Sequence, residues 1–145
     1  ARGVTVVGGS WVTDRNNGLI LYELPPNDAA KKFTYPVAMY DHNDGAAGCG
    51  GYVYRGKKIP GLAGHYLCGD LWNGRIFHVP AADLVLGKQA TLKEMTLYYN
   101  GKAITLRELV KGVNNRVDLR FGIDQVGDLY ILTKQDGKIR KLVAY

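Results

Sequence analysis

The chain has 145 residues, of which 46% are hydrophobic and 22% are charged. This balance excludes a disordered segment, and no window reaches the ~20 apolar residues that a membrane span requires. The formal net charge is +6, but the basic residues are spread along the chain and accompany no nucleic-acid motif, so we expect no nucleic-acid partner.

Strand candidates and tight turns follow one another along the chain. A weak first hairpin candidate spans residues 8–24, GGSWVTDRNNGLILYEL. The β-rich run GGYVYRG at 50–56 predicts a strand, and GHYLCGDLWNGRIFHV at 64–79 predicts a hairpin with an Asn-Gly turn. The segment 116–124, RVDLRFGID, alternates polar with apolar residues as a half-buried strand does, and 127–142, GDLYILTKQDGKIRKL, predicts a second hairpin.

One segment breaks the strand pattern. Residues 105–110, TLRELV, have apolar residues at helical spacing. They begin with Thr105, and Glu108 follows three positions later, which is the arrangement of a capping box. We therefore expect a short helical insertion in the last part of the chain.

The two strong hairpins are copies of one unit. Gly64, Gly74 and Ile76 of the first match residues 63 positions later in the second, and Gly18 and Ile20 match Gly74 and Ile76 at an offset of 56. A repeating unit of three or four short strands is typical of a β-propeller blade. About two and a half blades fit into residues 1–145, which we expect to form part of one propeller domain. Because a propeller protects its strand edges by closing a ring, we expect the remaining blades on a longer chain or on a partner chain.

The segment 35–79 resembles the C-terminal half of the glucose/sorbosone dehydrogenase family. This family contains the soluble sugar dehydrogenases that use pyrroloquinoline quinone, together with relatives that resemble hedgehog-interacting protein. Four elements carry the likeness: P-V-x-x-Y-x-H at 36–42, G-G-Y-V-Y-R-G at 50–56, I-P-x-L-x-G-x-Y at 59–66 and G-D-x-x-x-G-R-I at 69–76. The ending LRFGIDQVGDLYILTKQDGKIRKL is similar to the family's last blade.

The resemblance implies a six-bladed propeller, an exported protein located in the periplasm or outside the cell, and an active site on the central axis. In its quinoprotein members, basic residues hold the anionic quinone, Ca²⁺ polarises it, and a histidine removes the proton of the sugar hydroxyl. That histidine lies in N-terminal blades of the family, so the resemblance assigns no catalytic residue to this chain.

Two loops that precede predicted inner strands hold the candidate site residues. Asp41 and Asp44 are candidate Ca²⁺ ligands, because alternate carboxylates in a loop suit that ion, or they are turn residues. His42 is a candidate ligand of the cofactor, or a loop histidine bonded to a neighbouring aspartate. Arg116 is a candidate partner of the anionic quinone, or the partner of Asp118 in a salt bridge.

The last blade departs from the quinoprotein pattern. Members of that group begin this blade with two arginines at alternate positions, and alignment on Gly122 places those positions at Asn115 and Val117. Arg116 and Arg120 then lie one residue out of phase, and such a shift sends a strand side chain to the other face. We therefore keep two functions open: a quinone-dependent sugar or alcohol dehydrogenase, and a non-catalytic propeller that serves binding or assembly.

The remaining cysteines and histidines have less specific interpretations. Cys49 and Cys68 allow one disulfide or two free thiols, and the expected register does not place them directly opposite. His65 and His78 lie in the predicted hairpin strands, where we expect them to be structural.

Overall fold

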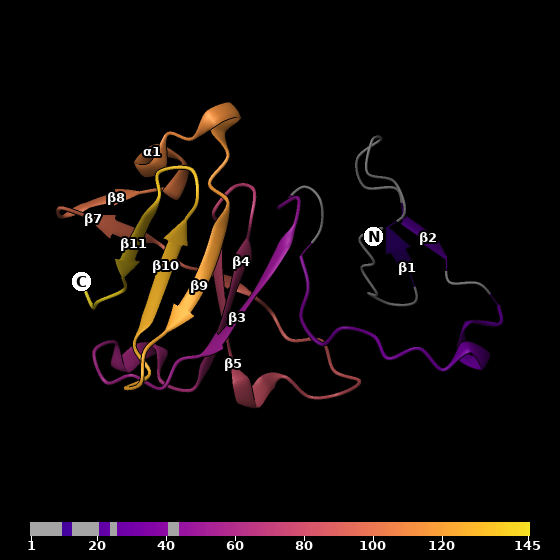
Figure 1. The fold of residues 1–145 in the computed structure, drawn as a ribbon. Helices are drawn as coiled ribbons and strands as arrows, with labels where there is room; N and C mark the ends of the chain where they lie inside the picture. Colours follow the sequence, from indigo (N-terminus) through magenta and orange to yellow (C-terminus); the bar gives the residue numbers. More distant parts are fainter. Residues whose placement is uncertain (1–9, 13–20, 24–25, 41–43) are drawn as a thin grey trace.

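The computed structural model describes residues 10–12, 21–23, 26–40 and 44–145, and its main elements are short antiparallel strands (Figure 1). The described strands form sheets of two, three, four and two strands, all antiparallel. Helical structure in this part of the chain is limited to α1 and four 3-10 turns at Asp28–Lys31, Pro60–Leu62, Ala81–Asp83 and Val113–Asn115. The all-β class is confirmed. None of the described helices is long and apolar enough to cross a bilayer.

The two strong repeat copies form hairpins with the same register. The first joins β4 (His65–Asp70) to β5 (Ile76–Pro80), and the second joins β10 (Leu129–Thr133) to β11 (Lys138–Lys141). The equivalent pairs are Leu67 with His78 and Cys68 with Phe77 in the first hairpin, and Tyr130 with Lys141 and Ile131 with Arg140 in the second. Each pair recurs 63 positions later, so both hairpin predictions are confirmed.

The weak copy near the start also forms a hairpin. Strands β1 (Ser10–Val12) and β2 (Leu21–Glu23) pair antiparallel, and Trp11 lies opposite Tyr22. That pair is equivalent to Leu67 with His78 at an offset of 56. Gly18 and Ile20, on which the sequence match depended, lie outside the described residues. The third copy is therefore supported by its backbone register as well as by the sequence match at two residues.

The larger sheet has the order β3-β4-β5-β6, with β3 at Gly48–Val53 and β6 at Lys93–Glu94. This confirms the strand predicted from the run at 50–56, which begins two residues earlier and ends at Val53. The β3–β4 register shifts between Cys49 and Tyr52, which is a β-bulge. Gly51 lies in the bulge, and a Cβ there would come within 1.7 Å of the Leu67 carbonyl oxygen. Only glycine allows the two backbones to approach this closely.

The second sheet has the order β9-β10-β11 and uses the predicted strand at 116–124, here β9 (Leu119–Ile123). The side chains of β10 alternate between buried and half-buried positions, as in a strand with one covered face. Leu129, Ile131 and Thr133 are on the buried face. Strands β9 and β3 lie side by side, so the two sheets meet along these two strands (Figure 1).

A small hairpin, which follows the first larger sheet and precedes the second in chain order, was not predicted. It joins β7 (Leu97–Tyr99) to β8 (Lys102–Ile104). Its turn is Asn100-Gly101, and both residues have positive φ, at 50° and 76°. This is the conformation of a type I′ turn. The Asn-Gly dipeptide between β-rich residues was the signal that could have found it.

The helical insertion is α1 (Leu106–Val110), and it has the expected capping box. The Glu108 N–H donates to the Thr105 hydroxyl, and the Glu108 carboxylate accepts from the Thr105 N–H at 2.8 Å. Leu106 and Val110 point into the core. The cap fixes where this short helix begins, and the two apolar residues attach it to the sheets.

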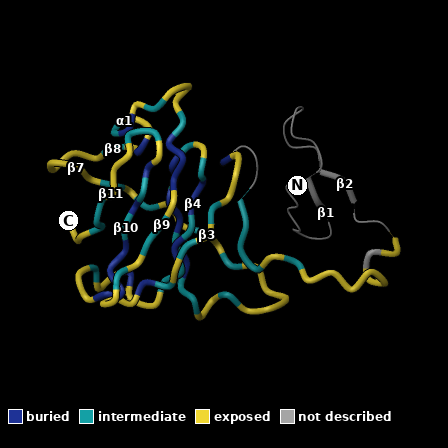
Figure 2. Tube along the Cα trace, in the orientation of Figure 1, coloured by how far each residue is buried: buried dark blue, intermediate teal, exposed yellow. Residues whose placement is uncertain are grey.

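One hydrophobic core fills the space between the two larger sheets (Figure 2). Leu67 and Ile76 come from the first sheet, and Leu119, Leu129 and Ile131 come from the second; each is at most 2% exposed. Leu67 and Ile76 lie on one face of the first sheet, since the residue pairs Leu67–His78 and Gly69–Ile76 are two positions apart, and Leu129 and Ile131 lie on one face of the second. The apolar area removed from water there stabilises the packing by about 25 cal/mol per Å².

A buried ion cluster joins the segment that follows β3 to the residue that precedes β10 and to the end of β11. The Asp128 side chain is only 2% exposed and lies 2.7 Å from the Lys141 ammonium and 3.4 Å from that of Lys58. The Tyr54 hydroxyl donates to its other oxygen at 3.4 Å. The ammonium of Lys141 holds the pKa of Asp128 below its ordinary value despite burial. A buried carboxylate is tolerated here because two cations compensate it.

Candidate functional site

The loops that precede β3 and β9 meet at the turn between β4 and β5. The Leu71 N–H donates to the Ala47 carbonyl oxygen at 2.8 Å. The Leu119 N–H donates to the Leu71 carbonyl oxygen, and the Val117 N–H to that of Trp72, both at 3.0 Å. The two loops named from the sequence therefore lie on either side of one turn.

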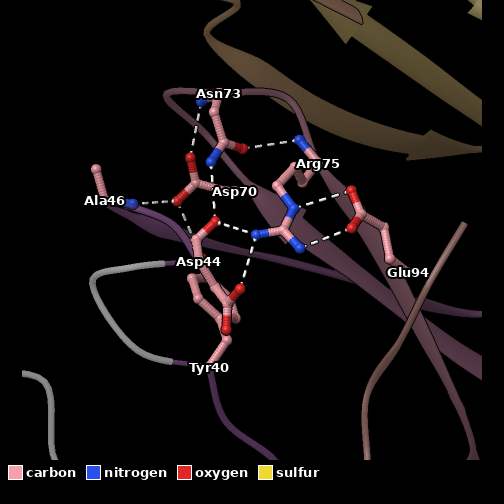
Figure 3. A network of polar contacts seen from close by, with 7 residues as sticks. All are labelled: Tyr40, Asp44, Ala46, Asp70, Asn73, Arg75 and Glu94. Atoms are coloured by element: carbon pink, nitrogen blue, oxygen red, sulfur yellow. Dashed lines mark hydrogen bonds and ion pairs between the residues drawn. The ribbon is translucent and has the colours of Figure 1, made fainter. Parts of the chain in front are cut away.

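Asp70 organises this turn from a fully buried position (Figure 3). One carboxylate oxygen accepts from the N–H groups of Ala46 and Ala47, both at 2.7 Å, and from the Tyr40 hydroxyl at 3.2 Å. The other oxygen accepts from the Asn73 N–H at 2.7 Å. A single side chain thus fixes the turn and the loop before β3 relative to each other.

Arg75 extends the network towards solvent (Figure 3). Its Nε and Nη2 donate to the two carboxylate oxygens of Glu94 at 2.9 and 2.6 Å, which is the bidentate geometry that guanidinium favours. Its Nη1 donates to the Asp44 carbonyl oxygen at 2.6 Å and to its carboxylate at 3.0 Å. The guanidinium also lies 5.0 Å from the centre of the Phe77 ring. The bonds to Glu94 and then Asp44 raise the pKa of Arg75, so its charge is permanent.

Tyr40 closes the inner side of the network. Its ring stacks on Phe77 with centroids 5.1 Å apart, and its hydroxyl points to Asp70. Burial, followed by the charge of Asp70, raises the pKa of the Tyr40 hydroxyl. The hydroxyl therefore stays protonated at any physiological pH and acts here as a donor.

Two cavities flank Arg75. One, of about 370 Å³, is lined by residues that include Arg75, Glu94, Met95 and Glu108. The other, of about 480 Å³, is lined by residues that include Tyr40, Asp44 and Gln89. Both are open and mix polar with apolar side chains.

The structure places Arg116 against the same turn from the other side. Its guanidinium lies 4.5 Å from the Trp72 ring centre and 2.5 Å from the Asp118 carboxylate. Gln135 donates to the second Asp118 oxygen, also at 2.5 Å. These bonds, that from Gln135 first, lower the pKa of Asp118. The salt-bridge interpretation of Arg116 is thus observed, while its proposed contact with a quinone stays a prediction.

Asn115 lies at the surface in an unusual backbone conformation. It has φ 57°, and Asn114 and Asp118 have φ 54° and 53°. Asparagine and aspartate tolerate this left-handed region better than other residues with a side chain, at a cost of about 1 kcal/mol or more each. The Asn115 N–H donates to the Gly112 carbonyl oxygen at 3.0 Å. Among the residues that the structure describes, no hydrogen bond or ion pair assigns the Asn115 side chain a role.

The predicted metal site is described only in part. Asp41 and His42 lie outside the described residues, and Asp44 makes the contacts with Arg75 given above. Its carbonyl oxygen and one carboxylate oxygen accept from this cation, and its role as a Ca²⁺ ligand stays a prediction. In the described part of the chain, no three His, Cys, Asp or Glu side chains are grouped to hold a metal.

Cys49 and Cys68 are free thiols in the structure. Cys49 pairs with Gly69 in the β3–β4 register, so Cys68 is displaced by one position from it. Burial raises the pKa of Cys49 to about 11 and also raises that of Cys68. Both thiols are therefore protonated and unreactive at neutral pH.

Sequence reasoning missed Asp70 and Arg75, the two residues that hold the site together. An aspartate two residues before a W-N-G turn is a common side-chain partner of a turn N–H, and this signal could have identified Asp70. Nothing local predicts that Arg75 reaches Asp44 and Glu94, which lie 31 and 19 residues away. No family model matches the sequence, and no solved structure matches the fold.

Proposed function

We propose that this chain supplies C-terminal blades of a six-bladed propeller of the glucose/sorbosone dehydrogenase type. In the complete, exported protein it would form one wall of a site that oxidises a sugar hydroxyl with bound pyrroloquinoline quinone. The observation that carries the proposal is the shared register of the three hairpins, because a propeller repeats one blade around an axis.

The arrangement of the loops supports the position of the site. Propeller sites collect at the loops that lead into the innermost strands, and the loops before β3 and β9 meet at one turn. Arg116 lies there with its guanidinium partly exposed, at 38% of the side chain. The proposed role of Arg116, with Asn115 beside it, is to bind the anionic quinone and orient it.

The quinone, when bound, would accept the hydride of the sugar carbon. This chain's own residues would bind and orient, and we assign none of them to proton transfer. Because Asp44 is already bonded to Arg75, we derive no step from a Ca²⁺ ion at this residue.

The test adds pyrroloquinoline quinone and Ca²⁺ to the complete protein and measures sugar oxidation with an artificial electron acceptor. A quinone titration followed by absorbance gives binding separately. We expect activity, and we expect Arg116→Gln to weaken quinone binding by about tenfold or more, the loss of one charge-assisted contact. Arg107→Gln, an exposed helix residue, is the matched control with wild-type binding.

A second candidate function is a non-catalytic propeller for binding or assembly. Two observations favour it: Asp118 neutralises Arg116, and Arg75 binds the carbonyl oxygen and one carboxylate oxygen of Asp44. Absence of any quinone binding by the complete, folded protein would select this function and reject the dehydrogenase.

A further inference from the structure

Two histidine rings on neighbouring strands are joined by a hydrogen bond. His65 on β4 and His78 on β5 have Nδ1 atoms 2.9 Å apart, with ring centroids at 5.0 Å. They are diagonal neighbours in the sheet, since His78 pairs with Leu67, two positions along β4 from His65. Both rings are half-buried, and neither has a task in the proposed function.

This bond limits the number of protons that the pair can carry. One Nδ1 must hold a hydrogen and donate it, while the other Nδ1 must present its lone pair. The donor ring can take up a further proton at Nε2 without loss of the bond. A proton on the acceptor Nδ1 would set two N–H groups against each other, so the bond ends when both rings are charged. Histidine changes its charge between pH 5 and 8, and the bond is therefore sensitive to mild acid.

The neighbouring strands decide which part of the sheet a second charge would disturb. On one side of His65, the Tyr54 N–H donates to the His65 carbonyl oxygen at 2.8 Å, and on the other side lies Pro80, so no charged side chain is paired with this ring. His78 lies directly opposite Lys93 of β6. Like charges directly opposite each other destabilise a strand pair. A charged His78 would therefore act against the pairing of β5 with β6.

The described residues bring no anion to His78 that could compensate such a charge. Burial, then the charges of His65 and Lys93, lower the pKa of His78 from its ordinary value of 6.5. Glu94 follows Lys93 on β6, so it points to the opposite face of the sheet. Asp128, which reaches this end of the sheet from the residue before β10, already pairs with two lysines.

Strand β6 is the element that such a charge would release. It has two residues, both exposed, and among the described strands it pairs only with β5. Its Glu94 makes the bidentate pair with Arg75 and lines both cavities of the candidate site. Release of β6 would therefore remove one partner of Arg75 and widen these cavities.

We propose that His65 and His78 form a pH switch: their bond keeps His78 uncharged opposite Lys93 at neutral pH, and protonation of both rings releases β6 in mild acid. Because the pKa of His78 is lowered in the folded state, the released state binds more protons below pH 6.5. The stabilisation is thus complete above pH 6.5 and is lost as the pH falls through the folded-state pKa. The proposal stands independently of the dehydrogenase.

The test is hydrogen exchange of the complete protein at about pH 7.5 and about pH 5, measured by mass spectrometry and corrected for the intrinsic pH dependence of exchange. A peptide that covers residues 91–97 reports on β6. Its protection should fall by about fivefold or more at the lower pH, while a peptide that covers β10 should keep its protection.

Two variants separate the switch from a merely structural histidine pair. His78→Asn places an amide near the position of Nδ1 but cannot take up a proton, so it should keep the protection of residues 91–97 at neutral pH and abolish the loss in acid. Lys93→Gln should reduce this loss at least about twofold, whereas Lys88→Gln, at an exposed lysine of the preceding loop, should leave it unchanged. Equal protection of residues 91–97 at both pH values in the wild-type protein, or an undiminished loss in both folded His78→Asn and Lys93→Gln, would overturn the proposal.

Discussion

At the level of single residues, burial decides which charged groups matter. Asp70 is fully buried and satisfies three backbone N–H groups, so its loss would remove one charged partner from three donors at once. The ion pairs of Arg75 lie near the surface, where Glu94 and Asp44 are 46% and 50% exposed. Pairs of this kind contribute about 0–1 kcal/mol each. Asp70 therefore dominates the stability of the site, although Arg75 makes as many contacts.

Replacing Asp70 by alanine should lower the free energy of unfolding by about 3 kcal/mol, since hydrogen bonds to a charged group contribute about 1.5–3 kcal/mol each and water can replace them in part at the exposed loop. Urea unfolding measures the change. Asp83→Ala, at an exposed aspartate of a 3-10 turn, should change stability by less than about 0.5 kcal/mol. Equal effects of the two substitutions would contradict the assigned role of Asp70.

Asp136 should show a pH effect of defined sign. Its bond to Arg140, followed by that from the Thr133 hydroxyl, lowers its pKa from 3.8 to about 2 against the effect of burial. A carboxylate with a depressed folded-state pKa stabilises the fold above pH 4 and loses this contribution as the pH falls towards 2. Arg140→Gln should move the Asp136 pKa back towards 3.8 and reduce the loss of stability between pH 4 and 2. Carboxyl NMR titration checks the pKa, and an unchanged value would reject the explanation.

At the level of elements, sheet packing depends on positions where no side chain fits. Gly69 lies on β4 beneath the second sheet, and a Cβ there would come within 2.7 Å of the Leu119 side chain and of the Arg75 carbonyl oxygen. The glycine therefore sets how closely the two sheets approach. Its match in the repeat frame is the half-buried Leu132, so the close approach at Gly69 is not repeated in the second sheet.

Gly69→Ala should destabilise the chain by about 1–3 kcal/mol, the usual cost of overpacking in a close-packed core. The matched control is Gly61→Ala, because a Cβ at Gly61 meets nothing within 4 Å and its φ is not in the left-handed region. Thermal unfolding of the two variants gives the comparison. A Gly69→Ala protein as stable as the control would mean that the sheets can separate without cost.

At the level of the whole molecule, the described sheets leave apolar surface and strand edges open. Ile139, Val126 and Tyr145 are 68%, 71% and 85% exposed. Within the described residues no strand pairs with the outer edge of β11. Monomeric proteins rarely expose edges and apolar residues in this way, because both promote association. This supports the proposal that further blades cover these surfaces.

Residues 1–145 produced alone should therefore self-associate and show no sugar oxidation. Sedimentation velocity at several concentrations measures the association, and dye binding detects the exposed apolar surface. Addition of the remaining blades should suppress both. A soluble monomer with a cooperative unfolding transition would contradict the expectation of missing blades.

Local sequence determined the hairpins and the helix of this protein. Asn-Gly and Asp-Gly dipeptides define tight turns, apolar alternation defines the buried face, and Thr105 with Glu108 defines the start of α1. These signals act over a few residues, so they can be recognised without knowledge of the fold. The β7–β8 hairpin carried the same kind of signal at Asn100-Gly101.

Only the tertiary structure decided the contacts between distant residues. Asp70 meets Ala46, Arg75 meets Glu94, and Asp128 meets Lys58 in the segment after β3, over 24, 19 and 70 residues of chain. His65 and His78 face each other because the hairpin register places them diagonally. Local propensity says nothing about such pairs, since they depend on how the sheets are aligned and packed. The turns and strand patterns thus followed from the sequence, while the polar network and the histidine pair followed from strand register and sheet packing.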